Sequence, residues 1–450
     1  MRSSRSVPPT GPDSPGTSEG GSGSIGSSGF DREGDPAPRV RTLNRSMQIS
    51  TPSTTRPLHA IGVPLGPAVL RRIFPAVVSA LDGGPALLPL PEYPAAVRDG
   101  LLAAMRPSVA VEDHDDPVAL VVPTSGSTGE PKGVLLGAGA LRSSATATHD
   151  RLGGPGRWLL TLPATHMAGL MILVRSVVAG TEPVAADMSR GFDPEAFAAA
   201  SVHVHRSSRT RRYTALVPHQ LSVILEAGGA ALHSLAAFDA VLVGGAAVAP
   251  KLLERARAAR VPIITTYGMT ETSGGCVYDG LPLDGVQVST TDSGRVRVAG
   301  AVLAHGYRLQ PGLTTEAFAD GWFVTADLGN VDTEGRLDVY GRLDDVAVSG
   351  GVNVPLPAVD AVVTGHAGVA EASAVALPDP DWGQRVVAVV VPRDPGDPPT
   401  LGSVRAHVLR QSPTAYAPKE LVIVHTLPRL PGGKVDRRGL TTRLIETTTG

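Results

Sequence analysis

Short apolar runs separated by polar, glycine-rich stretches predict the layout of the middle of this chain. Four runs read as buried strands, at residues 118–122, 158–162, 240–243 and 261–265, and residues 250–260 have the spacing of a helix. Strands and helices alternate in this way over about residues 118–339, which is typical of α/β layers. We therefore expect a large layered α/β domain.

The pattern differs on both sides of that region. Upstream, residues 68–81 have helical spacing and residues 86–90 resemble a strand, which leaves room for only a trimmed first subdomain. Downstream, residues 344–450 predict a small α+β domain, with strands at 371–376, 385–391 and 420–424 and a helix around 403–410. The expected boundary between the two domains is therefore near Asp344.

Composition narrows the class of protein. Residues 1–46 are rich in Gly, Ser and Pro and cannot bury enough apolar surface to offset their ordering entropy, so we expect a disordered tail before a domain at 47–343. A net charge of -2 over 450 residues argues against a nucleic-acid binder. Cys276 is the only cysteine, so no internal disulfide can form, and no run approaches the ~18 to 20 apolar residues that span a bilayer. These features predict a cytoplasmic protein without membrane attachment.

Residues 124–133 are the strongest candidate for chemistry. They follow an apolar strand and contain three glycines, four hydroxyl side chains and Lys132. Glycines let successive backbone N–H groups form a concave anion site, the hydroxyls add donors, and Lys132 adds a positive charge. A Walker P-loop is excluded, because its lysine directly follows a glycine, whereas Lys132 follows Pro131. A flexible surface loop is the alternative.

This run resembles the phosphate loop of the adenylate-forming enzymes, which include acyl-CoA synthetases, luciferases and the adenylation domains of peptide synthetases. Five further stretches, in order along the chain, resemble the core motifs of that family and extend the resemblance over about residues 118–440. The resemblance implies that the chain binds ATP. The phosphate contacts would come from Thr124, Ser125, Gly126, Ser127, Thr128, Gly129 and Lys132.

Two of these motifs follow predicted strands, where an open α/β sheet places its ligand crevice. By resemblance, the adenine contacts are Gly244, Gly245, Ala246, Tyr267 and Gly268. Thr270 would contact the α-phosphate, and Glu271 would hold Mg²⁺. Mg²⁺ prefers carboxylate and phosphate oxygens, which agrees with this role for Glu271. A plain strand-to-helix turn and a solvated glutamate are the alternatives.

Three later motifs resemble the ribose, hinge and lysine segments of the family. Asp327 would accept the two ribose hydroxyls, because each oxygen of a carboxylate can accept one O–H, and Arg342 would reach the same ribose. Asp344 falls on the hinge about which the small C-terminal domain turns, which makes that domain mobile. Lys434 falls on the catalytic lysine, whose ammonium stabilises the approach of a carboxylate to the α-phosphate.

Residues 162–170 resemble the acyl-pocket segment of the family and contain His166, and the apolar, helix-like run 171–178 that follows contains Arg175. His166 falls where family members place a gate between the acyl and CoA channels, and a packed core histidine is the alternative. Burying an unpaired guanidinium is unfavourable, so Arg175 should meet either a structural acid or a second carboxylate on the substrate. Four segments taken together, at residues 151–156, 166–175, 212–221 and 272–280, resemble one branch of the family, the short actinobacterial o-succinylbenzoate:CoA ligases of menaquinone biosynthesis. That likeness implies that Arg175 holds the aromatic carboxylate and that Gly274 and Gly275 leave room for a flat ring.

The expected activity has two half-reactions. ATP, Mg²⁺ and the acid give an acyl-adenylate and pyrophosphate, and the thiol of CoA attacks the adenylate after the C-terminal domain has turned. The alternatives are another acyl- or aryl-CoA synthetase, an adenylation enzyme that loads a carrier protein, and a catalytically silent nucleotide-binding module. A silent relative would be free to lose residues that this chain retains together, namely Lys132, Glu271, Asp327, Arg342 and Lys434. The sequence leaves open whether the chain forms a homodimer.

Overall fold

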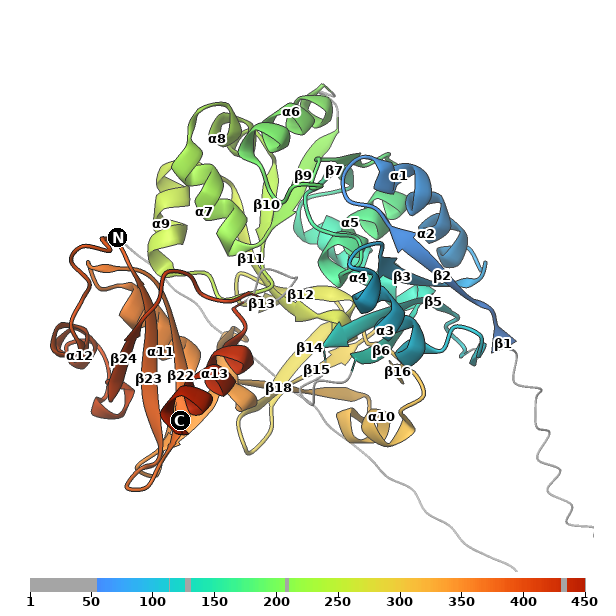
Figure 1. The fold of residues 1–450 in the computed structure, drawn as a ribbon. Coiled ribbons are helices and arrows are strands. Elements are labelled where there is room, and N and C mark those ends of the chain that lie inside the picture. The colour runs from blue at the N-terminus through green and yellow to red at the C-terminus, as the bar shows by residue number, and fades with distance from the viewer. Residues whose placement is uncertain (1–54, 113, 126–130, 207–209, 430–434, 450) are drawn as a thin grey trace, which may run out of the picture. The chain divides into compact units, whose positions relative to one another are not determined.

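The computed structural model describes residues 55–112, 114–125, 131–206, 210–429 and 435–449 (Figure 1). The tail predicted to be disordered, residues 1–46, lies outside this part of the chain. The described residues form one seven-stranded sheet, three five-stranded sheets and a two-stranded pair. None of the described helices is both long and apolar enough to cross a membrane. The architecture is the mixed α/β fold that the sequence predicts.

The first five-stranded sheet carries the hairpin that ends in the predicted phosphate loop. Its order is β16-β6-β5-β3-β2, parallel among β2, β3 and β5 and antiparallel from β5 to β16. The strands are β2 (Leu58–Val63), β3 (Ala86–Pro91), β5 (Val118–Ser125), β6 (Pro131–Gly137) and β16 (Gly306–Tyr307). The elements beside them are β1 (Thr55–Arg56), which pairs with β4 (Val111–Glu112), and helices α1 (Ala68–Arg72), α2 (Phe74–Leu81) and α3 (Ala95–Met105).

The helical region predicted over residues 68–81 is present, and the structure divides it into two helices. Helix α1 ends at Arg72, and α2 begins at Phe74 with Pro75 in its first turn. Proline has no N–H to donate and its ring clashes with the carbonyl four residues earlier, so it is disfavoured within a continuous helix and tolerated in a first turn. The helical region was therefore predicted correctly, and Pro75 explains its division.

The seven-stranded sheet holds the segments predicted to contact adenine and the acid. Its order is β13-β12-β11-β10-β9-β7-β8, parallel from β8 to β11 and antiparallel from β11 to β13. The strands are β7 (Gly156–Leu160), β8 (Val184–Ala185), β9 (Arg211–Leu216), β10 (Ala240–Val243), β11 (Ile263–Met269), β12 (Gly274–Tyr278) and β13 (Leu281–Pro282). The helices are α4 (Ala138–Arg151), α5 (Met167–Val178), α6 (Pro194–His205), α7 (Pro218–Ala227), α8 (Gly229–Ala236) and α9 (Pro250–Ala258).

Strand β7 shows why the parallel strands read as continuous apolar runs. Trp158 and Leu160 point into a core that includes α5, whereas Leu159 points into a second core formed with α6, α7, α8 and α9. Figure 1 shows α5 on one side of this sheet and α6 to α9 on the other. A strand covered by helices on both faces buries nearly all its side chains, so Trp158, Leu159 and Leu160 form an uninterrupted apolar run.

Residues 286–342 depart from the predicted alternation of strands and helices. They form an antiparallel sheet in the order β14-β15-β18-β17, with β19 paired to β18. The elements are β14 (Val286–Thr290), β15 (Arg295–Gly300), α10 (Pro311–Ala317), β17 (Phe318–Ala319), β18 (Trp322–Val331) and β19 (Leu337–Arg342). In β15, Val296 and Val298 are buried, while Arg295 and Arg297, which alternate with them, are only partly buried. That period-two pattern, together with turns at Gly294 and Gly335, favours hairpins, so the predicted alternation of strands and helices does not extend through these residues.

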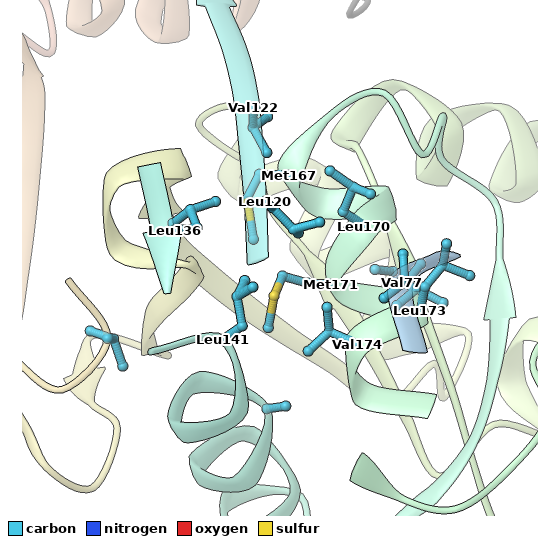
Figure 2. Close-up of a cluster of buried hydrophobic side chains, with 14 of the residues drawn as sticks. Val77, Leu120, Val122, Leu136, Leu141, Met167, Leu170, Met171, Leu173 and Val174 are labelled. Carbon is cyan, nitrogen blue, oxygen red and sulfur yellow. The ribbon is translucent and has the colours of Figure 1, made fainter. Parts of the chain in front are cut away.

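Helix α5 lies within the largest described core. Figure 2 shows how its side chains pack against β5, β6, α4 and α2, and the residues labelled there are Val77, Leu120, Val122, Leu136, Leu141, Met167, Leu170, Met171, Leu173 and Val174. All of them are buried. Burying one such aliphatic side chain contributes about 1.5–3 kcal/mol. These contacts therefore hold α5, and with it Arg175, in a fixed position.

The C-terminal residues build their own sheet, in the order β21-β20-β23-β22 with β24 beside β23. The strands are β20 (Val346–Ser349), β21 (Val352–Pro355), β22 (Val369–Asp379), β23 (Gly383–Pro392) and β24 (Glu420–Ile423). The helices are α11 (Leu356–Thr364), α12 (Leu401–Leu409) and α13 (Arg437–Thr449), with short turns η2 (Leu343–Asp345) and η3 (Thr414–Tyr416). The predicted strands and helix of this region are all present. The predicted hinge residue, Asp344, lies in η2.

Arg437 joins the beginning of α13 to the turn η2. One terminal nitrogen of Arg437 lies 2.7 Å from Asp345 Oδ1, and the other pairs with Asp360 of α11. One guanidinium thus lies between two carboxylates, and most of the side chain of Arg437 is covered. Burial, offset only in part by Arg437, raises the pKa of Asp360 to about 6.

Gly169, in the first turn of α5, offers a test of how closely this helix approaches the preceding chain. A Cβ at this position would lie 2.3 Å from Pro163 O and 2.8 Å from Leu162 O. Backbone carbonyls cannot move aside as a flexible side chain can. We therefore expect Gly169→Ala to destabilise the protein by at least about 2 kcal/mol, measured as a lower thermal unfolding midpoint.

The matched control is Gly312→Ala in helix α10, where no described atom lies within 4 Å of an added Cβ. Alanine favours a helix over glycine by about 0.8–1 kcal/mol, so this variant should be as stable as the wild type or slightly more stable. An equal loss of stability in both variants would contradict the steric explanation.

Candidate active site

Asp327 lies at the centre of the predicted ribose site. It faces Arg342 directly across the antiparallel pair of β18 and β19. Asp327 Oδ2 accepts a hydrogen bond of 2.8 Å from the hydroxyl of Tyr267, and Oδ1 lies 3.6 Å from Arg342 Nη1. The backbone N–H of Asp327 donates to Thr325 Oγ1. The structure therefore brings together three residues that the sequence assigned to the nucleotide.

The carboxylate of Asp327 retains capacity for further donors. Its two oxygens offer about four acceptor positions, of which the hydroxyl of Tyr267 occupies one. The residue is only 7% exposed, so water competes little for the remaining positions. Burial, together with the charge of Asp327, raises the pKa of Tyr267 above its usual value, which keeps this hydroxyl a donor.

Glu271 and Lys132 both contact Tyr307. Thr270 and Glu271 form the 3₁₀ turn η1 (Thr270–Thr272), which follows β11 directly. The hydroxyl of Tyr307 donates to Glu271 Oε1 at 2.9 Å, and Lys132 Nζ lies 5.2 Å from the centre of the Tyr307 ring, within the range of a cation–π contact. Burial and the charge of Glu271 raise the pKa of Tyr307. The sequence analysis missed Tyr307, because no local pattern links it to a residue 36 positions away.

Part of the predicted site lies outside the described residues. These residues are Gly126, Ser127, Thr128, Gly129 and Lys434, together with the side chains of Ser125 and Asp344. The two ends of the phosphate loop are described: Thr124 and Lys132 are register partners in the β5–β6 hairpin, and Thr124 Oγ1 donates to Lys132 O at 3.4 Å. The roles of the other loop residues and of Lys434 stay predictions.

The predicted adenine glycines follow the end of β10. A Cβ on Gly244 would lie 2.2 Å from Thr266 Oγ1, so only glycine allows β10 and β11 to approach so closely here. Gly245 has a φ of +79°, which favours glycine, and both Gly245 and Ala246 are exposed at the carboxyl end of the strand. This is where a parallel sheet presents a ligand site. Contact with adenine itself stays a prediction.

The glycines of β11 and β12 lie against each other and against α5. A Cβ on Gly268 would lie 2.1 Å from Gly274 O. A Cβ on Gly274 would lie 3.0 Å from Met171 Cγ, and one on Gly275 would lie 3.0 Å from Tyr278 Cε1. Gly274 therefore lies beside α5, and Gly275 lies beside Tyr278, whose hydroxyl contacts Arg175.

Arg175 is buried, with 3% of its surface exposed. Its Nη2 donates to the hydroxyl of Tyr278 at 3.2 Å, and its guanidinium carbon lies 5.1 Å from the centre of the Trp158 ring. Within the described part of the chain it forms no ion pair with an acid, and its Nε has no hydrogen-bond partner. The first of the two expected partners, a structural acid, is thus absent among these residues.

Arg175 donates to the first of two linked hydroxyl groups, those of Tyr278 and Thr148. Thr148 Oγ1 donates to Ser144 O at 2.8 Å, so the 3.0 Å contact between Thr148 Oγ1 and the Tyr278 hydroxyl is donated by the tyrosine. Tyr278 in turn accepts from Arg175. Tyr278 and Thr148 could not be identified from the sequence. They lie 130 positions apart, and each is typical of a buried residue in a strand or a helix.

His166 and Arg175 lie at different parts of α5. His166 is the residue that precedes the helix, and it is exposed, so the alternative of a packed core histidine is wrong. Arg175 lies in the last turn of the helix and is buried. The gating role of His166 stays a prediction.

His149 contacts the same indole as Arg175. The ring N–H of Trp158 donates to His149 Nε2 at 3.2 Å, which requires that nitrogen to be unprotonated. Burial, and to a smaller extent the positive charge of Arg175, lowers the pKa of His149 from 6.5 to about 4. His149 is therefore neutral at neutral pH and adds no second positive charge beside Arg175.

Two protein-family models match this sequence. The model for the AMP-binding enzyme matches residues 65–305, and the model for the AMP-binding enzyme C-terminal domain matches residues 358–434. The first match alone spans more than half of the 450 residues. The chain belongs to the family of AMP-binding enzymes.

This AMP-binding enzyme is similar to proteins that are named as CoA ligases or synthetases. A Mycobacterium tuberculosis protein named "Probable 2-succinylbenzoate--CoA ligase" is 46% identical over 390 residues, which are 86% of this chain and 98% of that protein. The o-succinylbenzoate CoA synthetase of Bacillus subtilis, solved with the acyl-adenylate OSB-AMP, is 25% identical with a TM-score of 0.66, covering 82% of this chain and 80% of that one. ATP-bound MatB of Rhodopseudomonas palustris shares the fold at 22% identity, with a TM-score of 0.73 and coverage of 86% and 89%.

The side chains of this AMP-binding enzyme fit a Mg²⁺ ion that is held mainly by a nucleotide. Mg²⁺ usually keeps several waters and binds one or two carboxylates together with substrate phosphates. Glu271 would supply one carboxylate, and among the described contacts Tyr307 donates to its Oε1, so Oε2 would face a metal ion. Among the described residues, no group of three or more His, Cys, Asp or Glu side chains could hold a metal without such phosphates.

The neutral state of His149 predicts how stability depends on pH. Unfolded His149 binds a proton near pH 6.5 and folded His149 near pH 4, so the unfolded state binds more protons between these values. Acidification through this window should therefore destabilise the protein, by up to about 3 kcal/mol from this residue. His149→Gln can still accept from Trp158 but does not titrate, so the fall in its unfolding midpoint over the same window should be smaller. Identical pH profiles for the variant and the wild type would contradict this account.

Proposed function

We propose that this AMP-binding enzyme is a 2-succinylbenzoate–CoA ligase of menaquinone biosynthesis. The observation that carries the proposal is the buried Arg175, which has no acidic partner in the described part of the chain. Its hydrogen-bond partner Tyr278 lies beside Gly275, which is next to Gly274. A substrate with two carboxylates can place one at the reacting phosphorus and leave the other for Arg175. The similarity to the M. tuberculosis protein and to the B. subtilis synthetase with OSB-AMP supports the choice of this acid.

In the first half-reaction, an oxygen of the succinyl carboxylate attacks the α-phosphorus of ATP. The bond from that phosphorus to pyrophosphate breaks, and the products are the acyl-adenylate and pyrophosphate. Both reacting groups are anions, so a preorganised positive charge lowers the barrier, and we assign that charge to Lys434. Thr270 would contact the α-phosphate, Glu271 would hold Mg²⁺, and the bound ion would neutralise charge on the phosphates.

The remaining polar groups hold the nucleotide in place. Asp327 and Arg342, paired across two strands, would bind the ribose, and Tyr267 orients the carboxylate that does so. Lys132 and the phosphate-loop donors would hold the pyrophosphate end. Holding the two reactants in line converts an encounter in solution into a step within one complex.

In the second half-reaction, the sulfur of CoA attacks the acyl carbonyl carbon, and AMP leaves with the electrons of the broken C–O bond. We propose that the C-terminal domain turns about Asp344 between the two steps and withdraws Lys434. His166, exposed at the beginning of α5, is positioned to gate the path between the acid and CoA.

Two other readings keep the same first step. A ligase for a different acid would share the fold and the mechanism. The likeness to MatB at 22% identity concerns the fold alone. An enzyme that loads a carrier protein would form the adenylate but would give no CoA thioester. The choice of acid and the choice of acceptor can therefore be measured separately.

The experiment that tests the function is pyrophosphate release with ATP and Mg²⁺, supplied with o-succinylbenzoate, benzoate, succinate or a medium-chain fatty acid, with and without CoA. We expect release with o-succinylbenzoate alone among these acids and a CoA thioester when CoA is present. Release with another acid would overturn the assigned substrate, and release without any thioester would overturn the assigned acceptor. Silence with all four acids would contradict the proposal as a whole.

Arg175→Met tests the recognition of the second carboxylate, because it removes the charge and retains most of the volume. We expect the KM for o-succinylbenzoate to rise at least about tenfold while the KM for ATP changes little, since a charged hydrogen bond contributes about 1.5–3 kcal/mol. Tyr278→Phe should produce a smaller rise in the same KM, because Arg175 keeps its charge but loses one partner.

The control is Arg142→Met. Arg142 lies on α4, is partly exposed and pairs with the exposed Asp82. This variant should leave both KM values unchanged. An unchanged KM for o-succinylbenzoate in Arg175→Met would return Arg175 to a purely structural role, and an equal rise in both KM values would indicate general damage.

A further inference from the structure

Tyr307 contacts two oppositely charged residues of the nucleotide site. Its hydroxyl donates to Glu271 Oε1 at 2.9 Å, and the ammonium of Lys132 lies 5.2 Å from the centre of its ring. The described structure has no ion pair between Lys132 and Glu271. A single neutral side chain therefore interacts with both charges, which among the described residues do not pair with each other.

The backbone of Tyr307 is fixed on the hairpin that carries the phosphate loop. Strand β16 pairs with β6 so that Tyr307 is opposite Val134, and the next N–H, from Arg308, donates to Gly133 O at 2.7 Å. The N–H of Tyr307 itself donates to Thr314 Oγ1 at 2.9 Å. Lys132 directly precedes this paired segment of β6, so Tyr307 and Lys132 belong to one rigid unit.

The other face of Tyr307 is held by aromatic packing. Its ring centre lies 5.8 Å from that of Phe318 in an edge-on arrangement, and the residue is only 6% exposed. Such packing leaves the ring little freedom to turn. The turn that carries Glu271 is fixed as well, because Glu271 O accepts from the N–H of Ala304 at 2.9 Å. The contact between Tyr307 and Glu271 thus joins two fixed elements.

We propose that Tyr307 is a positioning residue that orients Glu271 for a metal ion and keeps Lys132 from pairing with it. Donation to Oε1 fixes the rotamer of the carboxylate and leaves Oε2 for Mg²⁺. The ring attracts the ammonium by its quadrupole without neutralising it, so Lys132 keeps its full charge for the phosphates. Loss of the hydroxyl should weaken the metal-dependent part of ATP binding, and loss of the ring should weaken ATP binding with or without metal.

This proposal depends on the nucleotide site assigned under the proposed function, but its test uses no acid substrate. The affinity for ATP is measured by calorimetry in excess Mg²⁺ and again in EDTA, for the wild type, Tyr307→Phe and Tyr307→Leu. For Tyr307→Phe we expect roughly tenfold weaker binding in Mg²⁺ and an unchanged affinity in EDTA, because only a hydrogen bond to a charged group is removed. Tyr307→Leu should bind ATP more weakly under both conditions.

The matched control is Tyr93→Phe, which removes a hydroxyl from a residue that is 85% exposed. It should bind ATP as the wild type does under both conditions. Equal weakening in Mg²⁺ and EDTA for Tyr307→Phe, or no weakening in either, would overturn the proposal. Failure of the wild type to bind ATP at all would instead overturn the nucleotide site, whereas a failure to activate o-succinylbenzoate would overturn the substrate alone.

A double-variant cycle provides a second measurement that does not depend on one substitution. Glu271→Gln keeps an acceptor for Tyr307 but removes the charge that a metal ion needs. If Tyr307 acts through Glu271, the losses of Mg²⁺-dependent affinity in Tyr307→Phe and Glu271→Gln should not add in the combined variant. Fully additive losses would show that Tyr307 acts independently of Glu271.

Discussion

The buried guanidinium of Arg175 is the constraint on which the acid end of the site depends. A charge that is removed from water without a counter-charge is strongly destabilising, and the helix that carries it is packed into the largest core of the described chain. The protein compensates in part with the face of Trp158 and the hydroxyl of Tyr278, and it keeps His149 neutral nearby. Among the described residues, Arg175 Nε has no hydrogen-bond partner, and in the proposed function the carboxylate of the substrate supplies that interaction.

The acid end and the nucleotide end are joined by backbone pairing. Gly274 and Gly275, which lie beside α5 and Tyr278, are register partners of Met269 and Gly268 in β11. The same strand β11 continues into the turn that carries Glu271. A larger side chain at these glycines would therefore displace either α5 or the turn that carries Glu271, because β11 and β12 are in close backbone contact here.

The sequence predicted the parallel strands and the charged site residues because both depend on local patterns. Strands buried on both faces give continuous apolar runs, and Asp327, Glu271 and Lys132 lie in recognisable motifs. The partners of these charges could not be predicted in the same way. Tyr307 and Tyr278 reach residues 36 and 103 positions away, so only the folded chain places their hydroxyls. The antiparallel sheet at 286–342 was missed because this segment was assigned the same alternation of strands and helices as the residues before it.

Three charged residues of the candidate site share one kind of partner. Tyr267 donates to Asp327, Tyr307 donates to Glu271, and Tyr278 accepts from Arg175. Arg437, which is assigned no ligand, differs, because its two terminal nitrogens pair with the carboxylates of Asp345 and Asp360. A carboxylate neutralises the charge it pairs with, whereas a tyrosine hydroxyl fixes the direction of the charged group and leaves its charge in place. A tyrosine hydroxyl therefore orients Glu271 and Arg175 without neutralising them, whereas Asp327 also lies 3.6 Å from the guanidinium of Arg342.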